Sequence, residues 1–498
     1  MEENKYFEYI NYPSDDEKRK SSRRKNRIRE RVTAFVLLFV ILAILGVGVW
    51  FGVRYFFSGK ETKTLVVSTE TSTEVSTEVS ADLQEEMQQV IQNLIGNETE
   101  IVVDPSNEIV KEPTQDELFD EFLTSKISEY SLEEKVLALM IVRPEQITGV
   151  DTVIKAGDGT KTALEKYPVG GLLYTEKNVT DEKQFSEMLA NTASFVKRPT
   201  FFAVKEQCGN ALIGNKLKLD VPKSAYNVGE TMDPYNAYTA NQKLSEYLGG
   251  FGINMVLGPV ADVRTENEEQ SASLVWQECM YGKDPVVVSR MVLESVHAFE
   301  EKNIATTLMY FPSEGNLYDN PANTITNTQL TLEEAESSIK DIYKTGIDAG
   351  ADAILVSHAY AENLSTDNIP CSLSKDIYTK ILREDCGFTN TILISDELDA
   401  PTISEYFTSA ESAVKAFKAG ADMILCPENL DEAVTAVCEA VNSNVISEER
   451  INDSLKRVLR VKLKSEFEAQ QSTETSDTET LDTENEDTET TEETTGEE

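Results

Sequence analysis

The chain has few of the residues that most often build catalytic or metal sites. Among its 498 residues there are two histidines, His297 and His358, and six cysteines, none in a Cys-x-x-Cys spacing. This scarcity argues against a zinc site and implies no cofactor. No glycine-rich loop follows the first predicted strand, so dinucleotide binding is also disfavoured.

Positive charge is scarce and unevenly distributed. The net charge is −42, and no lysine or arginine follows Lys464. Such an excess of acid argues against nucleic acid as a partner. The main basic cluster, KRKSSRRKNRIRER, lies near the N-terminus at 18–31.

An uncharged apolar run, VTAFVLLFVILAILGVGVWFGV, follows that cluster directly. A helix needs roughly 20 apolar residues to cross a bilayer, and aromatic residues gather at its ends. We therefore predict a transmembrane helix over 32–57, with a cytoplasmic basic arm at 1–31 and the rest of the chain outside. A cleaved signal peptide is the alternative. A single-pass anchor of this kind suits the cell membrane of a Gram-positive type surface.

Two polar, low-complexity regions flank a central region. Residues 58–115 are predicted to form an extracellular stalk, and the short helical pattern at 81–96 within it indicates either self-association or a solvated helix. The Thr/Glu-rich segment 469–498 is predicted to be disordered.

The central region, 116–468, alternates apolar β-rich runs with helical patterns. This alternation is typical of a parallel sheet, and its eight units over this length predict an α/β fold of the (β/α)8 TIM-barrel type. An open doubly wound sheet is the second choice. The predicted strands are 138–142, 170–174, 200–204, 253–259, 304–311, 353–358, 391–395 and 423–427.

In such a barrel the active site lies at the carboxyl ends of the strands. The polar residues expected there are Arg143, Lys205, Glu206, Asp262, the loop 309–321, His358, Asp396, Glu397 and Glu428.

The motifs at these ends resemble glycoside hydrolase family 3, in its β-N-acetylhexosaminidase branch. The resemblance covers most of 130–465 and is carried by GFGINMVLGPVADV, YPVGGLLYTEKNV, YGKDP, LISDEL and SEERINDSLKRVLRVKLK. It implies cleavage of terminal N-acetylglucosamine with retention, through a glycosyl-enzyme intermediate. The family uses an Asp after the seventh strand as nucleophile and a His in the loop after the fifth strand as acid/base.

The resemblance transfers only in part to this sequence. The nucleophile position falls on Asp396 and the loop Asp on Asp319, but the acid/base His falls on Pro321. Glu314 lies in the same loop and is the candidate substitute acid. Losing a general acid costs about 10²–10⁴ in rate.

Most sugar-binding positions of the family are also replaced. The motif after the third strand reads KEQCG, so its Asp becomes Lys205, followed by Glu206. The Arg of the R-x-F-G motif falls on Cys279, and the Lys-His pair falls on Met309 and Tyr310. His358 alone keeps the family residue, and a hydrogen-bonded core role for it is the simpler interpretation.

Two functions follow from these residues. The favoured hypothesis is a membrane-anchored, catalytically impaired barrel that binds cell-wall glycan or an envelope protein, with Asp396 held by a neighbouring cation such as Lys205. The alternative is an active β-N-acetylhexosaminidase with Asp396 as nucleophile. Cys208 and Cys279 are expected at the same rim, as a disulfide or as ordinary thiols.

Overall fold

The computed structural model describes residues 113–206, 212–220, 224–264, 278–315, 317 and 319–486. The chain divides into two compact units, Met1–Glu108 and Ile109–Glu498, and the described residues belong to the second. The predicted transmembrane helix at 32–57, nearly all of the predicted stalk and Cys208 lie outside the described residues. Within those residues, no helix combines the length and apolar character that a membrane span requires.

Eight parallel strands form a closed barrel in chain order, and β1 pairs with β8 to complete it. The barrel predicted from the sequence is confirmed, and each strand overlaps its predicted run. The strands are β1 (Met140–Val142), β2 (Gly171–Tyr174), β3 (Phe201–Lys205), β4 (Met255–Val260), β5 (Ala305–Phe311), β6 (Ala353–Val356), β7 (Ile392–Glu397) and β8 (Met423–Leu425).

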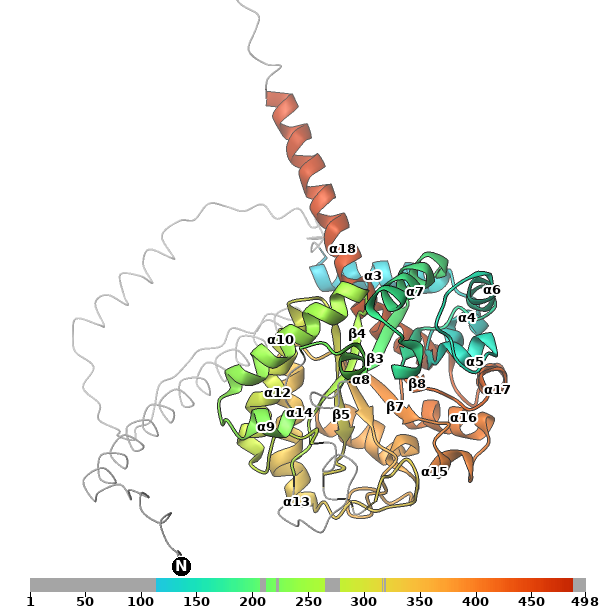
Figure 1. Ribbon diagram of the computed structural model, residues 1–498. Helices are drawn as coiled ribbons and strands as arrows, with labels where there is room; N and C mark the ends of the chain where they lie inside the picture. The colour runs from blue at the N-terminus through green and yellow to red at the C-terminus, as the bar shows by residue number, and fades with distance from the viewer. Residues whose placement is uncertain are drawn as a thin grey trace, which may run out of the picture. The chain divides into compact units, whose positions relative to one another are not determined.

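Helices surround the strands (Figure 1). The α-helices are α3 (Gln115–Ser128), α4 (Leu132–Leu137), α5 (Pro144–Thr148), α6 (Asp158–Lys166), α7 (Glu182–Phe195), α8 (Leu212–Leu217), α9 (Ala225–Gly229), α10 (Pro234–Phe251), α12 (Pro285–Glu300), α13 (Leu332–Glu334), α14 (Lys340–Asp348), α15 (Pro401–Ser404), α16 (Ser409–Ala419), α17 (Leu430–Asn442) and α18 (Glu448–Glu486). The described residues also form two 3-10 helices, η1 (Glu176–Asn178) and η3 (Cys371–Leu373), and two π-helices, η2 (Ala335–Ile339) and η4 (Asp376–Asp385).

Local sequence signals set the ends of these helices. Asp233 and Asp284 each cap a helix whose first residue is proline, and their carboxylates accept backbone N–H groups of the first turn. Proline tolerates this position because its missing N–H would have no intrahelical partner. At the end of α10, Gly252 adopts φ 89°, a left-handed conformation that glycine enters without strain. Such turns return the chain to the start of the next strand.

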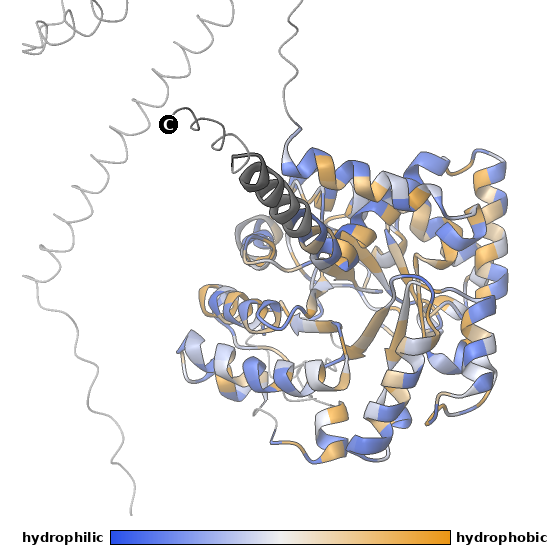
Figure 2. Ribbon diagram, turned by 90° about the horizontal axis from the view of Figure 1, so that it is seen from above, coloured by the Kyte–Doolittle hydropathy of each residue, from blue (hydrophilic) through white to orange (hydrophobic). Residues whose placement is uncertain are grey.

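The core is the barrel interior together with the layer between strands and helices. Figure 2 shows orange, hydrophobic strands inside helices that carry mixed colours. Every residue of β5, for example, is buried. Strands that are covered on both sides read as continuous apolar runs, which explains why the sequence predicted them well.

The two ends of the described region pack against each other. Phe119 of α3 stacks on Phe467 of α18 with ring centroids 4.5 Å apart, and Lys126 pairs with Glu466 at 3.1 Å. Helix α18 then continues to Glu486. The predicted disorder from 469 onward stays a prediction. Once the packed part of α18 has nucleated the helix, each further residue adds a hydrogen bond at little cost.

A buried ion cluster joins the amino ends of β7 and β8. The carboxylate of Asp422 is fully buried and accepts the backbone N–H of Leu393 at 2.9 Å. It also pairs with three arginines, namely Arg383, Arg450 and Arg457. This cluster lies at the opposite end of the barrel from the residues considered next.

Candidate active site

The carboxyl ends of β3, β5 and β7 bring a lysine, a tyrosine and several carboxyl groups together. Lys205 ends β3, Tyr310 lies on β5, and Asp396 and Glu397 end β7. Parallel strands that share a closed barrel place these ends on one face. The ammonium of Lys205 lies 4.0 Å from Asp396 Oδ1 and 3.4 Å from Glu397 Oε1. The predicted contact between Asp396 and a cation at Lys205 is present.

Lys205 is the charge centre of this group. Its Nζ lies 5.2 Å from the centre of the Tyr310 ring, and its side chain is 26% exposed. Burial alone would lower the pKa of this lysine. Tyr310, Glu397 and Asp396 outweigh that effect and hold its pKa well above the ordinary value. Lys205 is therefore a cation that shields Asp396, which is itself 5% exposed.

Glu314, from the loop after β5, is the buried acid of the site. It is 4% exposed, and Ser357 Oγ donates to its Oε1 at 2.5 Å. Burial, followed by the charge of Asp396, raises the pKa of Glu314 well above its ordinary value. This environment favours the neutral, protonated form of Glu314.

Asp262, just after β4, fixes the position of the Glu314 backbone. Its Oδ2 accepts the N–H of Glu314 at 2.8 Å, while its Oδ1 has no hydrogen-bond partner among the described residues. Burial raises the pKa of Asp262 to about 7. Asp262, at the end of the neighbouring strand β4, therefore fixes the backbone position of Glu314.

His358 has a structural role in this site. Its Nδ1 lies 2.7 Å from Ser372 Oγ and its Nε2 lies 2.8 Å from the carbonyl oxygen of Glu397. Both ring nitrogens are thus occupied, and the ring supports the end of β7. On the other side, Arg143 pairs with Glu397 and Asp399. Glu397 therefore bridges Lys205 and Arg143 beside the Asp396 carboxylate.

Other predicted residues lie outside this cluster. Asp319 and Glu428 are exposed, whereas Met309 and Cys279 are buried in the core. The Glu206 side chain turns toward α8, where its Oε1 accepts the N–H of Ile213 at 2.7 Å. Burial raises the pKa of Glu206 to about 8, so it is a buried neutral acid near that helix.

Sequence reasoning missed three members of the site. Ser357 and Ser372 hold Glu314 and His358, and Asp399 is the second partner of Arg143. Asp399 follows the strand-end acids within the same turn, which is a signal that could have been used. Ser357 also had a signal, since it directly precedes His358 at the end of a predicted strand, whereas Ser372 lies in a loop and had none.

The barrel and the buried carboxyl groups at its strand ends define a (β/α)8 protein with its candidate site at the face where such barrels carry active sites. The chain belongs to glycosyl hydrolase family 3: the profile of the Glycosyl hydrolase family 3 N terminal domain matches residues 131–461. This confirms the family resemblance found in the sequence.

The relatives are distant. A β-hexosaminidase A of Pseudoalteromonas piscicida is 20% identical over 330 residues, which cover 60% of this chain and 54% of that protein. A β-N-acetylglucosaminidase/β-glucosidase of Cellulomonas fimi is 26% identical over 42% of this chain and 38% of its own length. The chain thus spans about half, or less, of these two relatives.

Solved structures show the same fold. The glycoside hydrolase family 3 β-N-acetylglucosaminidase from Paenibacillus sp. str. FPU-7 is 25% identical, with a TM-score of 0.61 over 68% of this chain and 63% of that one. The β-N-acetylhexosaminidase from Beutenbergia cavernae DSM 12333 is 22% identical, with a TM-score of 0.60 over 67% of this chain and 98% of that one.

Proposed function

We propose that the barrel is a retaining glycoside hydrolase for β-N-acetylglucosaminides, with Asp396 as nucleophile and Glu314 as acid/base. The observation that carries this proposal is that two carboxyl groups at one barrel face lie in different environments. Burial and Asp396 raise the pKa of Glu314, whereas Asp396 is ion-paired with Lys205. Environments that separate two carboxyl groups in this way assign one as acid and the other as nucleophile.

The reaction uses each group twice. Asp396 forms a bond to the anomeric carbon as the glycosidic C–O bond breaks, and Glu314 gives its proton to the departing oxygen. Glu314, now a carboxylate, then takes a proton from water, and the water oxygen replaces Asp396 at the anomeric carbon. Both carboxyl groups return to their starting states, so no further reactant is required.

Lys205 explains how the charge of Asp396 is compensated when no substrate is bound. The ammonium offsets the charge of Asp396, which would otherwise lie uncompensated in a buried setting. Because Lys205 is 26% exposed and also pairs with Glu397, it can remain with Glu397 when Asp396 attacks. Because most sugar-binding positions of the family are replaced, this protein would bind its substrate through contacts that differ from the family pattern.

The second candidate is a non-catalytic barrel that binds cell-wall glycan or an envelope protein. The contact between Lys205 and Asp396 favours it, because the same ammonium that shields the carboxylate also weakens it as a nucleophile. For either function we propose display outside the cell on a membrane anchor, supported by the uncharged apolar run at 32–53 and the basic cluster before it.

The test is turnover of an aryl N-acetyl-β-D-glucosaminide by the purified protein. We expect measurable hydrolysis, its loss by at least about a thousand-fold in Asp396→Asn, and a mass increase of one glycosyl unit on Asp396 when a slow, activated substrate is used. Glu428→Gln is the matched control, since Glu428 is an exposed acid at the end of β8. Glycan binding without turnover would overturn the hydrolase and support the second candidate.

A further inference from the structure

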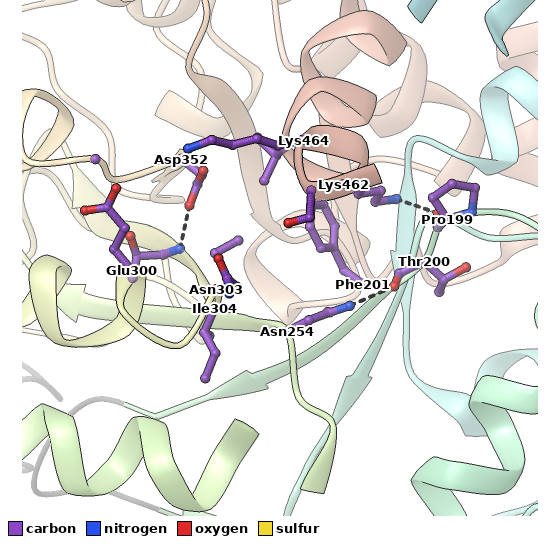
Figure 3. Close-up of a pocket in the computed structure, with 15 residues that line it drawn as sticks. Pro199, Thr200, Phe201, Asn254, Glu300, Asn303, Ile304, Asp352, Lys462 and Lys464 are labelled. Carbon is purple, nitrogen blue, oxygen red and sulfur yellow. Dashed lines mark hydrogen bonds between the residues drawn. The ribbon is translucent and has the colours of Figure 1, made fainter. Parts of the chain in front are cut away.

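A cavity lies at the opposite end of the barrel from the candidate active site. It has a volume of about 370 Å³ and is formed by the amino ends of β3, β5 and β6 and by α18. Figure 3 shows Glu300 and Asp352 on one side of it and Lys462 beside Pro199 on the other, with Lys464 extending toward Asp352. Its volume falls within the range of small-molecule sites.

The charged groups around this cavity form no close ion pairs. Among the described residues, no oppositely charged atom lies within 4.0 Å of the charged atoms of Glu300, Asp352, Lys462 or Lys464. The carboxyl group of Glu300 folds over Gly350, where an added Cβ would lie 3.1 Å from it. Burial raises the pKa of Asp352 to about 6; Lys464 opposes this rise and Glu300 adds to it. One wall of the cavity therefore carries two carboxyl groups, with Lys464 as a nearby cation beside Asp352.

The fold itself contains a filled counterpart of this wall. Asp352 precedes β6 in the sequence GADAI, and Asp422 precedes β8 in GADMI. Each accepts a backbone N–H of the preceding strand, from Thr306 at 3.0 Å and from Leu393 at 2.9 Å respectively. Asp422 is paired with three arginines, whereas Asp352 has the cavity beside it and Lys464 as a nearby cation.

The opposite wall carries an amine without a counter-ion. Lys462 Nζ donates to the carbonyl oxygens of Gly170 at 2.6 Å and Pro199 at 3.0 Å, and it lies 4.4 Å from the centre of the Phe201 ring. Two carbonyls use two of the three hydrogens of an ammonium, which leaves one for a ligand. Burial lowers the pKa of Lys462 to about 7, as expected for a cation whose anion is missing.

We propose that this cavity binds a small zwitterion of the amino-acid type, with its carboxylate on Lys462 and its ammonium against Glu300 and Asp352. A ligand with both charges satisfies both walls, whereas a simple anion or cation would satisfy only one. The site is separate from the carboxyl pair at the other end of the barrel, and the proposal does not depend on catalytic activity.

Isothermal titration of the purified full chain tests this directly. The probes are L-alanine, with acetate and ethylamine as single-charge controls, at pH 6.5. We expect L-alanine to bind with a Kd of about 1 mM or tighter, and each control to bind at least about tenfold more weakly. Absence of L-alanine binding up to 50-fold that concentration, or equal binding by acetate, overturns the proposal.

Variants locate the site. Lys462→Met and Glu300→Gln should each weaken L-alanine binding at least about tenfold. Lys456→Met is the matched control on the same helix, because Lys456 pairs with Asp120 at 2.7 Å outside the cavity. Glu300 is exposed, so its substitution serves even if Lys462→Met fails to fold. Unchanged affinity in Glu300→Gln, or an equal loss in Lys456→Met, refutes the assignment.

Discussion

Replacing Glu314 with glutamine separates its acid chemistry from its structural contacts. Glutamine keeps the shape of the side chain and an oxygen that accepts the Ser357 hydroxyl hydrogen bond. It has no proton to give to a departing oxygen. Glu314 is 4% exposed, so bulk water cannot easily replace it. We therefore expect the full cost of losing a general acid, a factor of about 10²–10⁴ in rate.

The size of the loss should depend on the leaving group. For a p-nitrophenyl or alkyl glycoside, the loss corresponds to about 3–5 kcal/mol of transition-state stabilisation. For a 2,4-dinitrophenyl glycoside, whose leaving group needs no proton, cleavage should be nearly normal and be followed by slow hydrolysis of the glycosyl-enzyme. Steady-state and pre-steady-state rates for both substrates provide the measurement. Ser357→Ala is the control, and we expect it to lose less than about tenfold.

The pH profile gives an independent readout. The acid must be protonated to act, and the pKa of Glu314 is raised well above its ordinary value. Activity should therefore persist at neutral pH and decline only as the pH rises through that raised pKa, and Glu314→Gln should lack this decline. If both glycosides lose activity equally and the alkaline limb is unchanged in the variant, Glu314 is not the acid.

Two further predictions concern stability. Asp422→Asn should lower the free energy of unfolding by about 3–5 kcal/mol in denaturant titrations, because it removes the buried negative charge that three half-buried arginines share. Asp348→Asn, on an exposed helix pair, should cost less than about 1 kcal/mol. Similar losses in the two variants would refute the argument. Glu206 has its pKa raised to about 8, so the native state keeps a proton that the unfolded chain releases above about pH 4.5. The free energy of unfolding should therefore fall by up to about 1.4 kcal/mol per pH unit between about pH 4.5 and pH 8. Glu206→Gln should remove that slope. Parallel plots of stability against pH for the two proteins would contradict the prediction.

The sequence predicted the barrel well because each signal was local. Strands covered on both faces are continuous apolar runs, and the strand β5 is an example in which every position is buried. Asp233 and Asp284, each before a proline, mark the starts of α10 and α12, a signal that the sequence carries but that was not used. The long pattern at 332–350 is helical as predicted but contains the π-turn η2, which periodicity alone does not reveal.

Of the contacts in the site, only one between two strand-end residues was predicted. The pairing of Asp396 with Lys205 was anticipated because both end strands of the same barrel. The burial of Glu314 was not, since the depth of a loop side chain depends on Asp262 and Ser357 from other strands. The preference for an impaired site came from counting family residues lost. That preference stays a hypothesis, which the activity measurements on Glu314 and Asp396 variants test.

The stacking of Phe119 on Phe467 bears on which pieces of this protein can be prepared alone. The family profile covers residues 131–461, so a fragment trimmed to those limits would lose both rings and the four ion pairs that join α3 to α18. It would also end one residue short of Lys462. The shorter fragment would expose the apolar face of α18 that α3 covers, and exposed apolar surface promotes aggregation. An expression fragment should therefore begin before Thr114 and extend beyond Phe467.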